Sequence, residues 1–265
     1  MSNIAVTHAD SGLVRASVVR TERVTPHVIR VTLGGGDLGR FLFQGFDQWF
    51  RLAIPVRGDE RLDNLPQRFG MGGALRYFTL PKGTRPAIRN YTVRQFRRGP
   101  LEMDVDFVVH GDAGIAAPWA ATVEPGTEVA FIDQGCGWRP PPADRYAIVA
   151  DESGMAAALG ILRDMPRDAR GDALIEVFDK DDRQADEAPD GVTVRWLVRS
   201  PRDAPGALAL PALRDLALPG SVYAFAVGEQ ALASGARRHL VNERSVPKSH
   251  VTFSGYWRIG KASLG

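Results

Sequence analysis

One six-residue segment, Arg89-Asn90-Tyr91-Thr92-Val93-Arg94, combines side chains that can together hold a planar cofactor carrying phosphate groups. On a strand, Arg89 and Tyr91 point to the same face and Thr92 lies beside them. An arginine can pair bidentately with a phosphate, a tyrosine ring can stack on an isoalloxazine, and a threonine can hydrogen-bond near its reactive nitrogen. This spacing suits a flavin dinucleotide. The alternative is an ordinary amphipathic strand, with Tyr91 in the core and the arginines in solvent.

A second segment, residues 106–120, runs from a strand pattern through glycines into small helix-forming residues. Glycines permit a close backbone approach, and the free amides at a helix start attract anions. A phosphate could therefore dock here. The alternative is a turn between a strand and a helix, with glycines for geometry only and His110 as a hydrogen-bonded surface residue.

Strands must position both segments, because the first half of the chain shows β patterns. Residues 14–19 and 28–33 are short and β-branched, and residues 51–56 suggest a third strand. Residues 57–86 show no clear period and predict a long loop, after which a strand resumes at Ile88. Apolar and acidic residues alternate over 101–109, which is typical of a half-buried strand in a barrel or sandwich.

The pattern changes after Gly137-Trp138-Arg139-Pro140-Pro141-Pro142, whose consecutive prolines disfavour a sheet. An apolar strand (146–150) and a helix with 3/4 spacing (155–165) follow. Further strands are predicted at 174–178, 192–198 and 222–227, with a second helix over about 230–242. Alternating strands and helices predict a doubly wound parallel sheet.

Composition narrows the possible chemistry. The chain has 265 residues, with 33 basic against 31 acidic side chains and no long run of like charge, so we expect no nucleic-acid partner. No leader pattern and no apolar run of membrane length is present, so we expect no membrane insertion. The single cysteine, Cys136, excludes an intramolecular disulfide and a cysteine-ligated iron–sulfur cluster or zinc site within one chain. The five scattered histidines predict no metal site either, so something else must carry electrons.

Taken together, the two segments resemble the siderophore-interacting proteins of the ferredoxin-NADP reductase-like superfamily. Residues 30–35, 150–154 and 255–260 add to this resemblance, which extends from about Val14 to Lys261. It implies an N-terminal antiparallel FAD-binding β-barrel (residues 1–139). A doubly wound parallel-sheet domain resembling NAD(P)H-binding domains, with a C-terminal tail, would follow (residues 143–265). The implied activity is FAD-dependent reduction of ferric siderophores in the cytoplasm, releasing iron(II) for assimilation.

The resemblance also assigns cofactor contacts. It makes Arg89 a flavin phosphate ligand, Tyr91 the ring that stacks on the isoalloxazine, and Thr92 its polar neighbour. The rest of the cofactor would be lined by Asp106, Val108 and His110, with backbone amides from Gly114, Ala116 and Ala117 at the pyrophosphate. Ile115 and Pro118 depart from the family, which often has proline and arginine at these positions.

A flavin carries the electrons itself, so no catalytic side chain is expected. Many ferric siderophores are bulky anions, which favours a shallow basic site beside the flavin. The candidate residues are Arg51, Arg244, Lys248, Arg258 and Lys261. Arg51 and Lys261 resemble positions where family members use a basic residue for substrate, and the alternative for all five is a solvated surface charge.

The electron donor is the more open question. The first strand of the second domain is followed by Asp151-Glu152-Ser153-Gly154 in place of a G-x-G-x-x-G fingerprint, and two acidic residues are unfavourable to phosphate. Ser153 and Gly154 could still supply amides, and Gly228 and Glu229 could approach a nicotinamide; the alternative for these is capping and turn geometry. The absence of an arginine cluster favours NADH over NADPH and leaves reduced ferredoxin possible.

Two other functions fit the same residues. One is a general NAD(P)H-dependent flavin or ferredoxin reductase, and the other is a siderophore-binding flavoprotein without enzymatic activity. We expect a monomer in each case.

Overall fold

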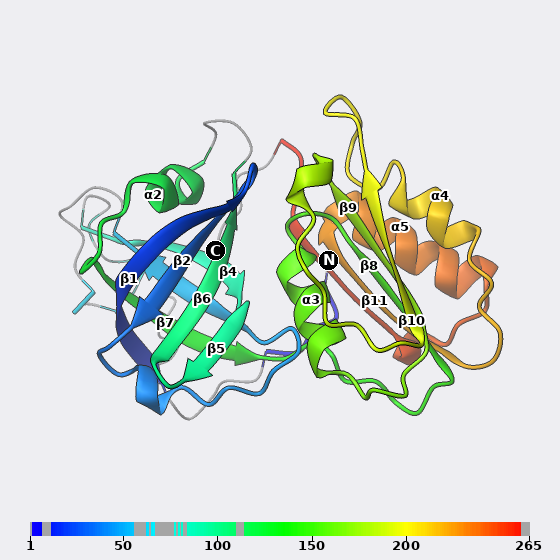
Figure 1. Ribbon diagram of the computed structural model, residues 1–265, viewed down its shortest axis with the longest axis horizontal. Coiled ribbons are helices and arrows are strands. Elements are labelled where there is room, and N and C mark those ends of the chain that lie inside the picture. Colours follow the sequence, from blue (N-terminus) through cyan, green and yellow to red (C-terminus); the bar gives the residue numbers. More distant parts are fainter. Residues whose placement is uncertain are drawn as a thin grey trace. The chain divides into compact units, whose positions relative to one another are not determined.

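The computed structural model describes residues 2–6, 12–55, 62–63, 65–66, 77, 79, 81, 84–109 and 114–260. Their contacts divide the chain into two compact units. The first unit is drawn from Val6–Gln44 and Gln48–Gly135, and the second from Met1–Ala5, Gly45–Asp47 and Cys136–Ser263. One holds an antiparallel sheet and the other a parallel sheet (Figure 1), as predicted.

The first unit is built on one seven-stranded sheet with the order β4-β3-β7-β1-β2-β6-β5. All its pairings are antiparallel, and it curves like a barrel (Figure 1). Within the described residues no hydrogen-bonded ladder joins the edge strands, so the barrel is open. The strands are β1 (Leu13–Thr25), β2 (Val28–Gly34), β3 (Trp49–Ile54), β4 (Ala87–Thr92), β5 (Gln95–Arg98), β6 (Leu101–Val108) and β7 (Glu128–Gly135).

The period-2 pattern of β6 gives this sheet its two faces. Met103, Val105 and Phe107 are buried in the core inside the barrel, together with residues of the other strands. The short helix α2 (Ala116–Thr122) covers one end of this core with Trp119 and Ala120. The acidic residues between them point to the outer face, as the alternation predicted.

The second unit contains a five-stranded parallel sheet with the order β10-β9-β8-β11-β12. The strand order reverses at β8, so the carboxyl ends of β8 and β11 meet at a topological switch point. Helix α3 covers one face of the sheet, and α4 and α5 cover the other (Figure 1). The elements are β8 (Arg145–Ala150), α3 (Met155–Asp164), β9 (Gly171–Val177), β10 (Val192–Val198), α4 (Ala209–Arg214), β11 (Val222–Glu229), α5 (Gln230–Arg238) and β12 (Val251–Trp257).

Two segments distant in sequence belong to the second unit. Near the N-terminus, Asn3 follows the edge of β12, where its backbone and side chain bond to Phe253 and Val251. The segment Gly45–Asp47 lies against α3, where the amide of Phe46 donates to Asp164 at 2.6 Å. The buried carboxylate of Asp47 accepts from the amides of Gly137 and Trp138 at 2.8–3.1 Å. Residues 137–142, after which the sequence pattern changes and which we expected to link the two domains, therefore lie within this unit.

Strands β5, β7 and β12 and helix α4 were not predicted. β7 has no period-2 signal because all its residues after Glu128 are buried, and β12 carries glycine and polar residues among its apolar ones. In the part of the chain that the structure describes, no helix is both long and apolar enough to cross a membrane.

The packing of Gly45–Asp47 on α3 depends on one glycine. A Cβ at Gly160 would collide with the carbonyl oxygen of Phe46, whereas a Cβ at Gly235 in α5 would meet only the end of the Leu210 side chain. We expect Gly160→Ala to lower the free energy of unfolding by about 2 kcal/mol or more, despite the helix-favouring alanine. Gly235→Ala is the matched control and should change stability by less than about 1 kcal/mol. Urea unfolding compares the two, and equal stabilities would show that the Phe46 contact is not tight.

Candidate functional site

In the first unit three of the predicted cofactor residues, Arg89, Tyr91 and Thr92, lie in the carboxyl half of β4. Tyr91 and Arg89 point to the inner face of the sheet, and Tyr91 packs on Phe107 of β6 with ring centroids 4.3 Å apart. Phe107 in turn contacts Trp119 of α2 at 5.6 Å. An aromatic row therefore runs from the edge strand toward α2, as a ring-stacking site requires.

The environment of Tyr91 keeps its phenol neutral. Burial raises the pKa of Tyr91, and the nearby charge of Arg89 only partly opposes that shift. The Arg89 guanidinium donates to the carbonyl of Ile88 at 2.7 Å, and it has no carboxylate partner among the described residues. Arg89 thus places a guanidinium without a described carboxylate partner next to the aromatic row, which suits a phosphate ligand.

β4 is also an edge strand. Only β3 pairs with it among the described residues, so alternate backbone groups of β4 point away from the sheet. At this edge Tyr91 lies on the inner face of the sheet, and Thr92, which is 8% exposed, lies on the outer face. A planar ligand beside the edge can contact both residues. These backbone groups are what a heterocycle with donors and acceptors could bind.

Trp49 adds a candidate that the sequence did not reveal. It lies directly opposite Thr92 in the β3–β4 ladder, on the same outer face. Its indole Nε1 is shielded from solvent and has no hydrogen-bond partner within the described part of the chain. A buried N–H without an acceptor is costly, so an acceptor on a bound ligand would relieve that cost. Only the strand register places Trp49 beside Thr92.

The outer face of β6 has another role than the predicted one for Asp106. Asp106 receives two hydrogen bonds from Arg30, at 2.7 and 2.9 Å, and lies 3.7 Å from Arg94. Next to it, Asp104 bonds to Arg97 and Thr32, and although burial alone would raise its pKa, these contacts hold it below the ordinary value. Ion pairs therefore occupy Asp106, and Val108 shares its face at the strand end.

The predicted phosphate-binding turn is described only from Gly114 onward; His110 lies outside the described residues. Gly114 has φ +104°, with open space where a Cβ would be, and Ala116 begins α2. The first amides of a helix have no partner within it, so those of Ala116 and Ala117 are available in principle. Pro118 has no N–H, which reduces the donors of this turn.

In the second unit, the predicted nicotinamide residues meet at what we call the carboxyl edge, the ends of β8, β9 and β11 with the turns that follow them. Asp151 organises it, and its side chain is fully buried. One carboxylate oxygen accepts from the amides of Ser153 and Gly154 at 2.9 and 3.3 Å and from the Ser153 hydroxyl at 2.6 Å. The other accepts from the amide of Glu229 at 2.6 Å and from Trp257 Nε1 at 3.3 Å. Ser153, Gly154 and Glu229 are thus brought together by a carboxylate.

Gly228 and Glu229 complete this arrangement. Gly228 has φ +128°, and a side chain there would collide with the Asp151 carboxylate. The Glu229 carboxylate caps α5 by accepting from the amide of Ala231, and it also accepts from the amide of Ile259 at 3.3 Å. The capping role that the sequence left as an alternative for these residues is the one the contacts display.

Two more buried acids flank Asp151. Glu152 accepts two hydrogen bonds from Arg199, at 2.6 and 2.8 Å, and both side chains are only 3% exposed. Glu176 lies 3.5 Å from the same guanidinium and accepts from the amides of Gly206, Leu208 and Ala209 at 2.8–3.1 Å. Arg199, the one buried arginine among the described residues of this edge, is therefore neutralised by carboxylates of the chain.

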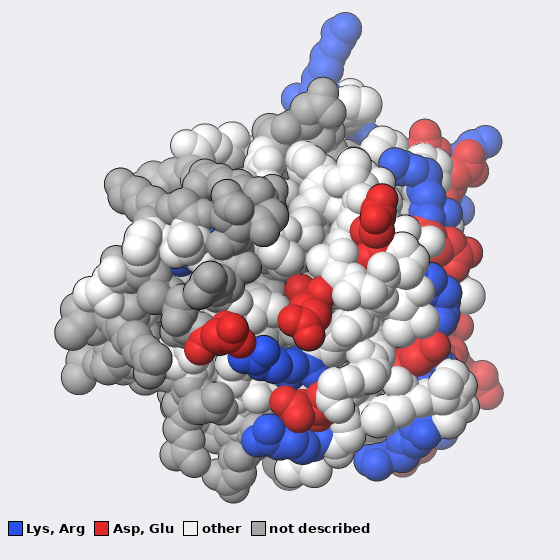
Figure 2. All heavy atoms as spheres, turned by 90° about the vertical axis from the view of Figure 1, so that its left-hand side faces the viewer, with Lys and Arg blue, Asp and Glu red and all other residues white. Residues whose placement is uncertain are grey.

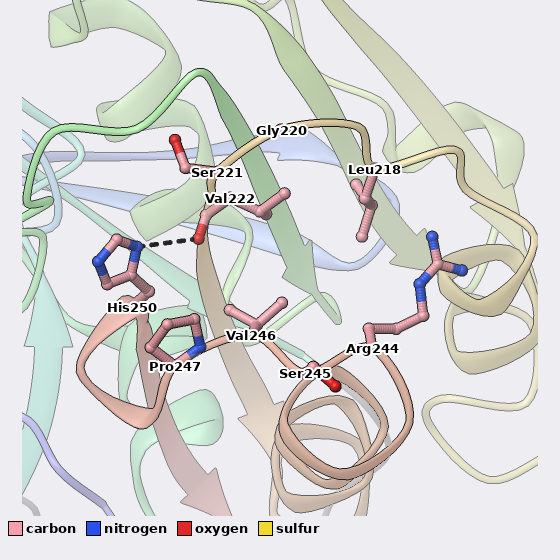
Figure 3. Close-up of a pocket in the computed structure, with 9 residues that line it drawn as sticks. All are labelled: Leu218, Gly220, Ser221, Val222, Arg244, Ser245, Val246, Pro247 and His250. Carbon is pink, nitrogen blue, oxygen red and sulfur yellow. Dashed lines mark hydrogen bonds between the residues drawn. The ribbon is translucent and has the colours of Figure 1, made fainter.

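The basic candidates do not form one group. Arg244 lines a small pocket at the amino end of β11, across from His250 (Figure 3), and its guanidinium donates to the carbonyls of Arg214 and Leu216. Lys248 precedes β12 and Arg258 follows it, so a strand about 20 Å long separates them. Arg244 and Lys248 therefore cannot share a platform with Arg258, which corrects the sequence-based grouping. Arg51 lies on the outer face of β3, where burial lowers its pKa, and Lys261 lies outside the described residues.

Asp151 makes the stability of the second unit depend on pH. Burial raises its pKa from the ordinary 3.8 to about 6 in the folded protein, helped by the charge of Glu152. The folded state therefore holds this proton more tightly than the unfolded chain. Wild type should lose about 3 kcal/mol of unfolding free energy relative to Asp151→Asn as the pH rises from about 4 to about 6, and no more above that. Urea unfolding of both proteins across this range measures the difference, and a difference independent of pH would contradict the shift.

Known proteins resemble this chain over most of its length. The model of a family described as "Siderophore-interacting FAD-binding domain" matches residues 17–137, and the model described as "Siderophore-interacting protein" matches residues 143–260. The ferric vibriobactin reductase ViuB of Vibrio cholerae is 33% identical over 248 residues, which cover 92% of this chain and 88% of ViuB.

Two further relatives extend the comparison. The NADPH-dependent ferric-chelate reductase of Escherichia coli is 27% identical and is matched over 91% of each chain. The crystal structure of a siderophore utilization protein from T. fusca superposes with a TM-score of 0.78 at 31% identity, covering 98% of both chains. The chain belongs to the siderophore-interacting protein family.

Proposed function

We propose that this protein binds FAD in its first unit and reduces ferric siderophore complexes, releasing iron(II) in the cytoplasm. The observation that carries this proposal is the edge of β4. There an aromatic row and a cation without a described carboxylate partner lie on the inner face, and the shielded indole N–H of Trp49 lies on the outer face beside Thr92. The match to an FAD-binding domain model over residues 17–137 supports the identity of the ligand.

The residues present fit a flavin in distinct roles. Tyr91 would offer its ring to the isoalloxazine, and Arg89 would pair with a phosphate. Thr92, which is buried, and the shielded indole Nε1 of Trp49 would donate hydrogen bonds at the ring edge. Asp106 would act one step away, through its ion pairs with Arg30 and Arg94. When bound, FAD supplies two electrons per reduction cycle, enough for two ferric ions, and the protein only positions it.

The substrate would approach the first unit near Arg51. A ferric siderophore is bulky and commonly anionic, so a long-range attraction raises its rate of encounter without a closed pocket. On the face drawn in Figure 2, basic and acidic side chains lie among one another over the described part of the surface. In the first unit, attraction would therefore come from a local cation, Arg51; Arg258 and Lys261 are the corresponding candidates in the second unit. The second unit would bring the reductant, NADH, NADPH or reduced ferredoxin, and the protein would act as a monomer.

The function itself is tested by colour and product. The purified protein should be yellow or take up added FAD, and a ferric siderophore with a reductant and ferrozine should yield coloured iron(II). Tyr91→Ala should weaken FAD binding about tenfold or more because the stacked ring is lost, whereas Tyr91→Phe keeps the ring and should stay within about threefold. Flavin fluorescence titration measures both. A colourless protein that does not bind added FAD would contradict the proposal. A protein that binds FAD but yields no iron(II) would favour a siderophore-binding flavoprotein without enzymatic activity.

The role of Arg51 is tested by salt. Arg51→Ala should lower the turnover of an anionic ferric siderophore about threefold or more at low ionic strength and should reduce the dependence of the rate on salt. Arg98→Ala is the matched control, because Arg98 is exposed on β5 at the other edge of the same sheet. If both variants keep the wild-type rate and salt slope, Arg51 does not meet the substrate.

A further inference from the structure

The carboxyl edge of the parallel sheet has the topology of a dinucleotide-binding site, but its buried side chains are mainly acidic and would repel the phosphates of a dinucleotide. Dinucleotide-binding folds hold a pyrophosphate on backbone amides at the turn after the first strand and at the helix start. Here that turn follows β8, and the amides of Ser153 and Gly154 already donate to Asp151. The Asp151 carboxylate therefore occupies the amide donors that would bind a phosphate in a dinucleotide-binding fold.

The neighbouring positions are filled in the same way. The amide of Ala231 at the start of α5 is taken by Glu229, and three amides before and in the first turn of α4 are taken by Glu176. The one buried cation, Arg199, is held bidentately by Glu152. Displacing any of these carboxylates would leave a charge at most 3% exposed without its hydrogen bonds, which is costly.

The charge balance adds to the obstacle. Four buried carboxylates, Asp151, Glu152, Glu176 and Glu229, face a single buried guanidinium. A pyrophosphate entering this edge would meet repulsion in a region of low dielectric, where charge interactions are strong. Exposed cations such as Arg258 lie in solvent and are screened.

We infer that the carboxyl edge does not bind the pyrophosphate of a dinucleotide donor, so that reduced nicotinamide mononucleotide reduces the flavin about as well as NADH does. This inference rests on the proposed function, since it needs a bound flavin as electron acceptor. The reduced nicotinamide gives up a hydride, which with one proton from solvent reduces the flavin, and the nicotinamide leaves oxidised. The adenylate half contributes no binding energy to this step.

The first test compares donors on the FAD-loaded full chain. Anaerobic stopped-flow bleaching should give second-order rate constants for NADH and reduced nicotinamide mononucleotide that agree within about threefold. A preference for NADH or NADPH above about thirtyfold overturns the inference. A protein that does not take up FAD fails at the preceding step and contradicts the proposed function instead.

The second test reads binding directly and needs no turnover. ADP carries the pyrophosphate and adenylate of a dinucleotide, and titration calorimetry on FAD-loaded protein should show no saturable heat up to about 1 mM. A dissociation constant below about 0.1 mM overturns the inference. Dithionite could bleach the flavin while no nicotinamide donor does. In that case the ADP titration alone tests the inference, and absence of ADP binding supports it.

The third test assigns the cause. Glu152→Gln removes one carboxylate and loosens Arg199, which keeps Glu176 as a partner. The ratio of the NADH to the mononucleotide rate constant should rise about fivefold or more. Glu187→Gln makes the same substitution at an exposed site before β10 and should leave the ratio as in wild type. A ratio unchanged in Glu152→Gln would overturn the inference that the carboxylates exclude the pyrophosphate.

Discussion

The second unit depends on a buried carboxylate that satisfies backbone donors at the ends of the parallel strands. Asp151 joins the turn after β8, the end of β11 and the indole of Trp257 through five hydrogen bonds. Without such an acceptor, buried amides at the switch point would lack partners, and each would cost roughly 1–3 kcal/mol. The same carboxylate that completes the fold also fills the place where a related fold would hold a phosphate.

In the first unit the main structural feature is an open barrel, in which β4 is an edge strand. The open edge costs little where backbone groups can reach solvent, and it provides the donors and acceptors that a planar ligand needs. The outer face of β2 and β6 is meanwhile held by ion pairs, Arg30 with Asp106 and Arg97 with Asp104. These pairs link β2 and β5 to β6 on the outer face.

Under the proposed function, the two units would have separate tasks. One offers an aromatic and cationic strand end that suits a flavin, and the other offers a switch point lined with acids. That second feature separates this chain from a dinucleotide-binding domain with a glycine-rich phosphate turn, although the strand order and crossover connections are those of such a domain. The fold alone does not settle the donor, because side chains at the strand ends decide which charges it can accept.

Much of this organisation is already determined by the sequence. The 3/4 spacing of residues 155–165 and the alternation over 101–109 depend on local periodicity, so α3 and β6 could be predicted. The family motifs located Tyr91 and Arg89. The neighbours of each side chain at the two candidate sites were decided only by the tertiary structure. They depend on strand register and on burial, which no local sequence pattern encodes. Trp49 became a candidate because β3 pairs it with Thr92. Arg244 was separated from Arg258 because the two residues lie toward opposite ends of β12. Of the two buried acids after β8, Asp151 accepts backbone amides and Glu152 pairs with Arg199.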